Sequence, residues 1–316
     1  MSVPAGEPPV VVHEIEKRFG DAVALAGVSF EVQPAELFGL VGPDGAGKTT
    51  LLRILSTLLV PDAGRATVLG LNVVNDMWEV RSRLGYMPGK FSLYQDLTVE
   101  ENLRFFAAVF GTTPEQGYET IAPIYSHIEP FADRRAGALS GGMKQKLALS
   151  CALVHRPDIL LLDEPTTGVD AVSRREFWDL LHELQSTGLT IVVSTPYMDE
   201  ASRCDRVALI QQGGLLAVDE PSRIGMRFPH PLFSVRTNER YRMIQVLRQY
   251  EHAVAVHPFG EVLHYSDARA DSALIAASVQ EFLAANGFTD VDVRRVEPGI
   301  EDTFMALMGA PAESAA

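Results

Sequence analysis

A glycine-rich stretch near the start of the chain combines the residue types that hold phosphate. The stretch "GPDGAGKTT" fits the pattern G-x-x-x-x-G-K-[ST] over residues 42–49. Its glycines let the backbone turn so that N–H groups point at one anion, and the helix that follows adds its positive end. Lys48 is expected to reach the β- and γ-phosphates of a nucleotide, and the Thr49 hydroxyl to ligate Mg²⁺. The residues predicted to contact the nucleotide are Gly42, Pro43, Asp44, Gly45, Ala46, Gly47, Lys48, Thr49 and Thr50.

Two adjacent carboxylates supply the other half of such a site. Asp163 ends the apolar run in "ILLLDEP", where a carboxylate can hold Mg²⁺ directly or through water. Glu164 follows it and is placed to polarise an attacking water as a general base. Alone, these residues could be an ordinary acidic strand end, but the upstream phosphate loop favours the functional interpretation. We therefore predict Lys48 and Glu164 as catalytic residues, and Thr49 and Asp163 as metal ligands.

The segments around these residues predict an α/β fold. "ELFGLV" before the loop reads as a strand, and "TTLLRILSTLL" after it has helical spacing. "DILLLDEP" and "LTIVVST" are continuous apolar runs, which suit a parallel sheet covered on both faces. Residues 98–111 begin with a threonine N-cap and acidic residues and end at a glycine, which predicts a helix.

The pattern changes near residue 221. From there the sequence predicts strand, helix, two strands, helix and strand, which is the β-α-β-β-α-β order of a ferredoxin-like α+β domain, and then a final amphipathic helix. We predict a disordered segment over residues 1–9, a nucleotide-binding domain over 10–224 with a helical subdomain at about 90–150, and an accessory domain over 228–310.

Composition restricts the possible classes of function. The chain has 316 residues, 47% of them hydrophobic, and a formal net charge of -14, which disfavours a free-standing nucleic-acid binder. Its two cysteines, Cys151 and Cys204, are far apart and indicate buried thiols in a reducing compartment. No apolar run reaches membrane-spanning length, and the first ten residues lack a secretory pattern. We therefore expect any membrane role to come through a partner.

The stretch "LSGGMKQK" at residues 139–146 resembles the signature of ATP-binding cassette (ABC) ATPases. The resemblance covers residues 10–220. It implies a P-loop NTPase cassette, with a RecA-like core, an antiparallel β-subdomain and a helical subdomain. It also implies a head-to-tail dimer, in which Ser140, Gly141 and Gly142 of one subunit contact the ATP held by the other subunit's phosphate loop. Phe19 resembles the aromatic residue that stacks on adenine, although a core phenylalanine is the alternative.

Two positions depart from this family's pattern. The family usually has a histidine after a strand such as "VVST" and a glutamine after "YMP", whereas this chain has Pro196 and Gly89. The resemblance gives the histidine a role in ATP cleavage, and gives the glutamine a contact with Mg²⁺ and water and a link to the helical subdomain. Neutral variation and slowed or asymmetric hydrolysis both remain open. Because Glu164 is retained, we expect nucleotide binding to survive and turnover to fall.

The whole chain is similar to ATPase subunits of ABC-2-type exporters, which often end in a small domain with a motif like "VEPGIEDTFMALM". The resemblance implies an ATPase that uses ATP and Mg²⁺, a separate membrane permease, a second ATPase subunit and no nucleic-acid partner. It implies a cytoplasmic location, peripheral on the inner face of the cell membrane. A translation-factor cassette would carry two cassettes, and a DNA-repair cassette would carry a long coiled-coil insertion. A nucleotide-binding regulator with little or no turnover is the alternative function.

Overall fold

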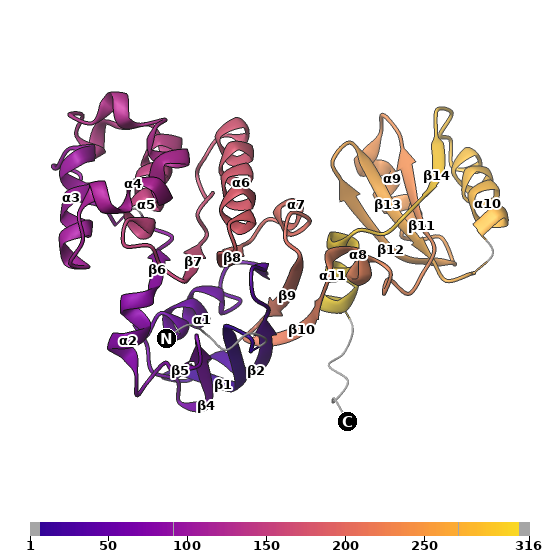
Figure 1. Cartoon of the computed structure of the whole chain (residues 1–316). Coiled ribbons are helices and arrows are strands. Elements are labelled where there is room, and N and C mark those ends of the chain that lie inside the picture. The colour runs from indigo at the N-terminus through magenta and orange to yellow at the C-terminus, as the bar shows by residue number, and fades with distance from the viewer. Residues whose placement is uncertain (1–6, 91, 271, 310–316) are drawn as a thin grey trace. The chain divides into compact units, whose positions relative to one another are not determined.

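A computed structural model of the chain describes residues 7–90, 92–270 and 272–309. The chain divides between Pro221 and Ser222 into two compact units (Figure 1). Of the segment 1–9 predicted to be disordered, residues 1–6 lie outside the described residues. Pro9 is buried, and its carbonyl accepts a hydrogen bond from the Leu69 N–H at 2.7 Å.

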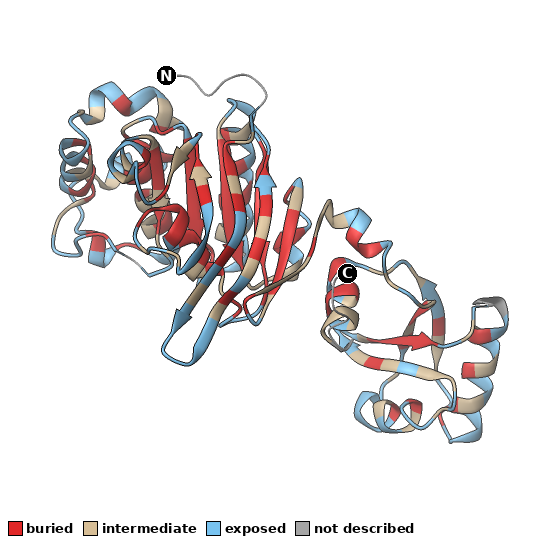
Figure 2. Cartoon of the chain, turned by 90° about the horizontal axis from the view of Figure 1, so that it is seen from below, coloured by how far each residue is buried: buried red, intermediate tan, exposed pale blue. Residues whose placement is uncertain are grey.

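The first unit is built on a six-stranded sheet with the order β10-β9-β3-β8-β7-β6. Neighbouring strands in this sheet are parallel, except that β10 is antiparallel to β9. Strands β3, β7 and β8 are buried at every position, which confirms the prediction from their continuous apolar runs (Figure 2). The strands are β3 (Leu37–Val41), β6 (Leu84–Met87), β7 (Ile159–Asp163), β8 (Thr190–Thr195), β9 (Arg206–Gln211) and β10 (Gly214–Asp219).

A smaller antiparallel sheet, with the order β2-β1-β4-β5, covers the first helix of this unit. One hydrophobic core joins residues of both sheets through helix α1 (Lys48–Leu55), whose leucines and Ile54 are fully buried. Because α1 is anchored on both sides, the loop at its start is held rigidly. The strands are β1 (Val10–Phe19), β2 (Ala22–Val32), β4 (Ala63–Val68) and β5 (Leu71–Asn72).

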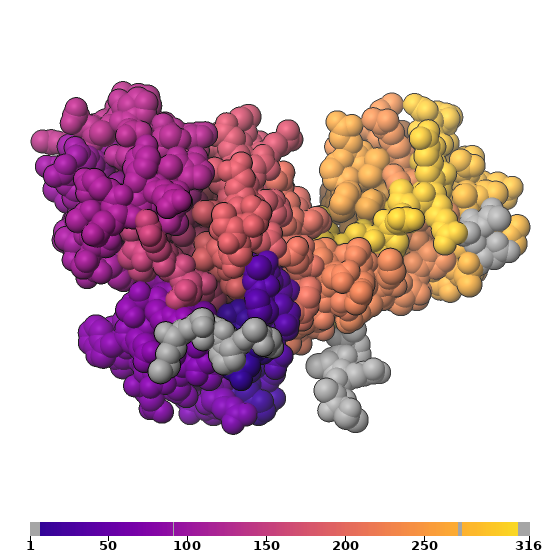
Figure 3. Space-filling view, viewed as in Figure 1, coloured from indigo at the N-terminus to yellow at the C-terminus, as the bar shows by residue number. Residues whose placement is uncertain are grey.

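The other helices of the first unit include a layer of three that pack on one another, α3, α4 and α5. Helix α3 starts with a capping box, in which the Thr98 hydroxyl accepts from the Glu101 N–H and the Glu101 carboxylate accepts from the Thr98 N–H. The helix predicted at 98–111 is thereby confirmed. In Figure 3 this layer, in magenta, and the N-terminal strands, in indigo, form separate lobes of the unit. The helices are α2 (Met77–Arg83), α3 (Val99–Val109), α4 (Pro114–Tyr125), α5 (Gly141–Leu153), α6 (Ala171–Ser186) and α7 (Met198–Ala201), with 3₁₀ turns at Glu129–Phe131 and Ala136–Ala138.

The second unit has the predicted β-α-β-β-α-β order. Its antiparallel sheet, with the order β12-β13-β11-β14, shares a hydrophobic core with helices α9 and α10. The elements are α8 (Pro221–Gly225), β11 (Leu232–Arg236), α9 (Arg240–Leu247), β12 (Ala253–Phe259), β13 (Val262–Asp267), α10 (Ser272–Ala285), β14 (Asp292–Val296) and α11 (Ile300–Gly309).

Both cysteines are buried and unpaired, as predicted. Burial raises the pKa of the Cys151 and Cys204 thiols well above the usual range, so both stay protonated at neutral pH. Among the described residues, no helix is long and apolar enough to cross a bilayer.

Candidate functional site

The phosphate loop connects β3 to α1, and its shape depends on two glycines. Gly47 has a φ of +108°, and a Cβ there would lie 2.5 Å from the Ala24 carbonyl oxygen of β2. A Cβ on Gly42 would overlap the carbonyl oxygen of Ile210 in β9. The loop therefore lies directly against the backbone of two strands, and a side chain at either position would displace it.

Lys48, the first residue of α1, is buried to 3% exposure. Its Nζ donates to the carbonyl oxygens of Gly42 at 2.7 Å and Pro43 at 3.0 Å, and lies 3.1 Å from the Glu164 Oε1. The two residues predicted to be catalytic, distant in sequence, are thus in contact. They border one cavity of about 160 Å³, lined by Ala24, Asp44, Gly45, Ala46, Gly47, Lys48, Thr49, Thr50 and Glu164.

The two predicted metal ligands also meet. The Thr49 hydroxyl donates to the Asp163 Oδ1 at 2.9 Å, and Asp163 is buried at the end of β7. Mg²⁺ prefers hard oxygen ligands and is usually held by one or two protein groups together with phosphates and water. A hydroxyl and a carboxylate beside the phosphate loop fit that requirement. Burial and the nearby Asp163 charge raise the pKa of Tyr86 to about 12, so its phenol stays neutral.

Ser194 of β8 is a residue that the sequence reasoning missed. Its hydroxyl donates to the Asp163 Oδ1 at 2.8 Å and accepts from the Glu164 N–H at 3.0 Å. It therefore positions both carboxyl residues. The register that pairs Asp163 with Ser194 brings them together. Ser194 is one of three hydroxyl residues in the strand "TIVVST", so its residue type alone did not single it out.

Glu164 has a left-handed backbone conformation, with a φ of 48°. Residues other than glycine rarely adopt it, and the cost is on the order of 1–3 kcal/mol. The hydrogen bonds from its N–H to the Ser194 carbonyl, at 3.1 Å, and to the Ser194 hydroxyl help to hold this conformation. It directs the carboxylate back towards Lys48 instead of along the strand.

The remaining predicted nucleotide contacts lie outside this cavity. Phe19, at the end of β1, is 54% exposed, which does not fit a core phenylalanine, and the Lys17 Nζ lies 5.7 Å from its ring centroid. Ser140 is the exposed N-cap of α5, and its hydroxyl accepts from the Met143 N–H at 3.4 Å. Gly141 and Gly142 are the first residues of that helix. Their role towards nucleotide stays a prediction that needs a second subunit.

The segment after Glu164 is tied to the signature helix and to α6. The Gln145 side chain of α5 donates to the Pro165 carbonyl. Asp170 caps α6, and hydrogen bonding, chiefly from the Ser173 N–H, lowers the pKa of its carboxyl. The segment between Glu164 and α6 is therefore held at both of its ends.

Both departures from the family pattern adjoin the site. A Cβ on Gly89 would lie 2.9 Å from the Asp163 carbonyl oxygen and 3.7 Å from its Oδ2, so a side chain there would start beside the metal ligand. Pro196 follows β8, next to Thr195, whose carbonyl accepts from the Gly42 N–H of the phosphate loop at 3.3 Å. Neither residue offers a polar side-chain group.

The loop that carries Pro196 is fixed by the buried Glu200. The Glu200 carboxylate accepts from the Thr195 hydroxyl at 2.5 Å and from the Thr166 hydroxyl at 2.7 Å, and the Arg174 Nε lies 3.5 Å from it. The Arg174 guanidinium lies over the Tyr197 ring, 4.4 Å from its centroid. The backbone around position 196 is therefore well anchored although the side chain of the usual residue is missing.

A larger apolar cavity of about 540 Å³ lies between β6 and the helical layer. Met87 and Pro88, which directly precede Gly89, contribute to its wall together with residues of α2, α3 and α5. The Phe110 ring stacks on His155 at 3.7 Å. The segment Met87–Gly89 thus borders both this cavity, which we call the apolar groove, and the carboxylate of Asp163.

Comparison with known proteins agrees with this geometry. The family model for the ABC transporter matches residues 25–167. The probable multidrug ABC transporter ATP-binding protein YbhF of Escherichia coli (strain K12) is 38% identical over 310 residues, which are 96% of this chain but 53% of that protein. The chain thus spans about half the length of that relative.

Two further comparisons cover most of the other protein's length. The Nod factor export ATP-binding protein I of Rhizobium sp. (strain N33) is 35% identical over 303 residues, which are 95% of this chain and 96% of that protein. A dimeric post-hydrolysis state of the ATP-binding cassette MJ0796 bound to ADP and Pi superposes with a TM-score of 0.61. Its identity is 25%, and the match covers 67% of this chain and 98% of that one. The chain belongs to the family of ABC transporter ATP-binding proteins.

Proposed function

We propose that this chain is the ATP-binding subunit of an ABC-type exporter, which binds and hydrolyses ATP to drive a separate membrane permease. The observation that carries the proposal is the convergence of Lys48 and Thr49 of the phosphate loop with Asp163 and Glu164 of β7 and the turn after it. Export is the direction supported by the names of the relatives, one a probable multidrug transporter component and one a Nod factor export protein.

Each residue has a distinct part in this function. The loop N–H groups and Lys48 bind the phosphates, and Thr49 and Asp163 hold Mg²⁺, which neutralises phosphate charge when it is bound. Phosphate oxygens would replace Glu164 as the partner of Lys48. The Glu164 carboxylate then becomes free to accept a proton from the attacking water.

Gly89 and Pro196 support a lower turnover than that of a complete site. Position 89 adjoins Asp163, and position 196 follows a residue that contacts the phosphate loop. Loss of one positioned hydrogen-bonding group commonly costs about 10² to 10³ in rate. We therefore propose that this chain is the degenerate member of an asymmetric pair, which clamps ATP while a second subunit hydrolyses it.

The apolar groove beside β6 supports a permease contact. Its wall includes exposed apolar side chains, Trp78 at 75% and Val109 at 61%, which are costly to leave in water. The segment Met87–Gly89 links this groove to Asp163. A permease segment bound in the groove can therefore affect the nucleotide site through it, and bound nucleotide can affect the groove. On this proposal the chain works on the cytoplasmic face of a membrane and has no nucleic-acid partner, which its net charge of -14 supports.

A nucleotide-binding regulator with little turnover is the second candidate. It is favoured by the same two positions, Gly89 and Pro196. Phosphate release that disappears in Glu164→Gln supports the ATPase. A background rate in the unmodified protein that Glu164→Gln leaves unchanged supports the regulator, because Glu164 then has little or no turnover to support.

The nucleotide site is tested by Lys48→Ala. We expect affinity for Mg-ATP to fall at least tenfold, about 1.4 kcal/mol, because no other cation lines the cavity among the residues described there. Isothermal calorimetry with purified protein measures this.

Arg236→Ala is the matched control, because it removes one exposed positive charge from the second unit. Its affinity for Mg-ATP should equal that of the unmodified protein. Unchanged affinity in Lys48→Ala, with the fold intact by circular dichroism, would refute the assignment.

A further inference from the structure

The second unit contains a cavity that the ATPase function does not use. It has a volume of about 640 Å³, within the range of small-molecule sites. Residues of strands β12 and β13 and of helix α11 contribute to its wall, and Figure 1 labels these elements. Side chains alternate between the two faces of a strand. Phe233 and Tyr265 therefore face the core shared with α9 and α10, whereas Leu232 and His264 face the cavity.

Most of the cavity wall is apolar, and its charged groups have one sign. Val254, Phe259 and Met305 contribute to the wall, and Glu301 and Asp302 of α11 supply carboxylates. None of the described residues that line it is a lysine or an arginine. With the lining histidines His230, His257 and His264 counted as neutral, the formal charge at this cavity is negative, which favours a cationic ligand over an anionic one.

One polar pair is built into the wall. His264 is 9% exposed, its Nδ1 lies 2.6 Å from the Asp302 Oδ1, and its ring stacks on Phe259 at a centroid distance of 4.0 Å. The other carboxylate oxygen of Asp302 accepts from the Gly299 N–H at 2.9 Å. The imidazole is thus fixed in position and orientation.

This pairing decides what the histidine presents to a ligand. An ionised carboxylate only accepts hydrogen bonds, so the N–H of a neutral imidazole must be on Nδ1, and Nε2 carries the lone pair. The polar end of the cavity then offers acceptors and negative charge. A ligand that matches this surface has an N–H donor, a positive charge and an apolar body.

We propose that this cavity binds a small hydrophobic amine in its ammonium form, at a site separate from the nucleotide site. The ammonium N–H groups donate to the His264 Nε2 and interact with the Asp302 carboxylate. The apolar body lies against Val254 and Met305.

The test compares three probes of nearly equal size on the full chain at pH 8. The probes are 2-phenylethylamine, 2-phenylethanol and 3-phenylpropanoate, and saturation-transfer NMR titrations measure their affinities. We expect the amine to bind at least tenfold more tightly than the carboxylate, with the alcohol in between. Equal affinities for the three probes, or no binding of the amine, would overturn the proposal.

Two variants locate the binding. Ala306→Phe fills the cavity and should abolish amine binding, and Asp302→Asn should weaken the amine at least threefold while leaving the alcohol unchanged. Asp292→Asn is the matched control, because it removes a carboxylate that pairs with Arg294 outside the cavity. If Ala306→Phe does not fold, Met305→Trp fills the cavity from its exposed side. Undiminished amine binding in a folded, filled variant would place the ligand elsewhere and overturn the proposal.

Discussion

Gly89 and Pro196 each remove a side chain from the site without disturbing the backbone around it. Thr195 keeps its contact with the phosphate loop, and Glu200 holds the surrounding segment. The residues proposed to bind Mg-ATP are therefore in place, whereas the histidine and the glutamine that the family usually has at these two positions are missing. This combination predicts binding with slow chemistry.

Restoring both side chains should raise turnover. We expect Gly89→Gln combined with Pro196→His to increase steady-state phosphate release by roughly tenfold or more, because a catalytic hydrogen bond is typically worth 10² or better. Glu164→Gln gives the background rate. If the unmodified protein already turns over at about 1 to 10 per second, the two departures are neutral and the clamp interpretation fails.

Gly89→Ala is the control for backbone strain. A Cβ at this position lies 2.9 Å from the Asp163 carbonyl oxygen, so any side chain there requires the backbone to shift. The alanine variant introduces that shift without the amide group. ATP affinity and circular dichroism are compared before the rates. No gain in the double variant, with affinity intact, would mean that the slow step lies in dimer closure or in a partner.

At the scale of elements, the local sequence pattern was enough to place the phosphate loop. It was not enough to predict contacts between residues that are distant in sequence. The phosphate loop could be placed because an apolar run, three glycines and a helical pattern follow one another. The roles of Ser194 and Gln145 could not be predicted in this way, because they depend on strand register and on how α5 packs. The same holds for His264 and Asp302, which are distant in sequence and meet only when α11 lies over the sheet.

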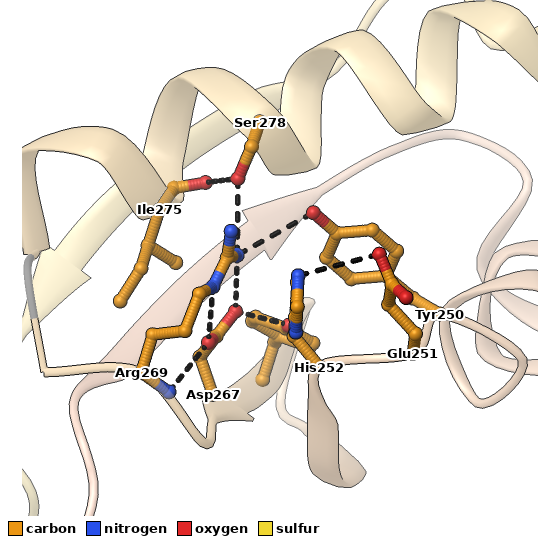
Figure 4. Close-up of polar contacts among 8 residues, drawn as sticks. Tyr250, Glu251, His252, Asp267, Arg269, Ile275 and Ser278 are labelled. Atoms are coloured by element: carbon orange, nitrogen blue, oxygen red, sulfur yellow. Dashed lines mark hydrogen bonds and ion pairs between the residues drawn. The ribbon is translucent and has the colours of Figure 1, made fainter.

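A polar network fixes the end of β13 to helix α10 in the second unit (Figure 4). Asp267 is fully buried and accepts from the Tyr265 hydroxyl at 2.5 Å and from the Arg269 guanidinium at 2.7 and 2.9 Å. Arg269 also donates to the Ser278 hydroxyl of α10 at 3.0 Å. Burial alone would raise the pKa of Asp267, but the hydrogen bonds from Arg269 and Tyr265 outweigh it and lower that pKa.

Asp267 should make the second unit sensitive to acid. Since its folded pKa lies below the ordinary 3.8, its stabilising effect is complete well above 3.8 and is lost as the pH falls through the folded value. Asp267→Asn should destabilise the unit by roughly 2–3 kcal/mol at pH 7, and the difference from the unmodified protein should shrink towards pH 3.

Hydrogen exchange of peptides from β13 and α10 measures this, because both tryptophans, Trp78 and Trp178, lie in the first unit and cannot report on the second. Asp292→Asn, in an exposed pair with Arg294, should cost about 1 kcal/mol or less. A pH-independent difference for Asp267→Asn would show that this carboxylate does not contribute through its charge.

At the scale of the whole molecule, a hydrophobic core in the first unit and another in the second unit share no residue. The first core contains residues from both sheets of the first unit and from α1. The second contains residues from the sheet of the second unit and from α9 and α10. Helix α8, at the division, belongs with the second: Ile224 is fully buried, and the Thr303 hydroxyl of α11 donates to the Gly225 carbonyl at 3.4 Å. The predicted boundary at residue 224 lies near the end of that helix, whereas a fragment that ends at Pro221, its first residue, leaves the rest of α8 with the second unit.

A fragment of residues 1–221 should therefore fold alone and bind Mg-ATP with an affinity within about twofold of the full chain. Every residue that lines the nucleotide cavity lies between Ala24 and Glu164, and the core that supports α1 is complete in this fragment. Calorimetry measures the affinity, and tryptophan fluorescence during urea unfolding shows whether the fragment is folded. The complementary fragment, 222–316, should fold and bind no nucleotide, yet retain binding of 2-phenylethylamine. A folded 1–221 fragment that does not bind Mg-ATP would mean that the second unit contributes to the nucleotide site, and the two-domain interpretation would be wrong.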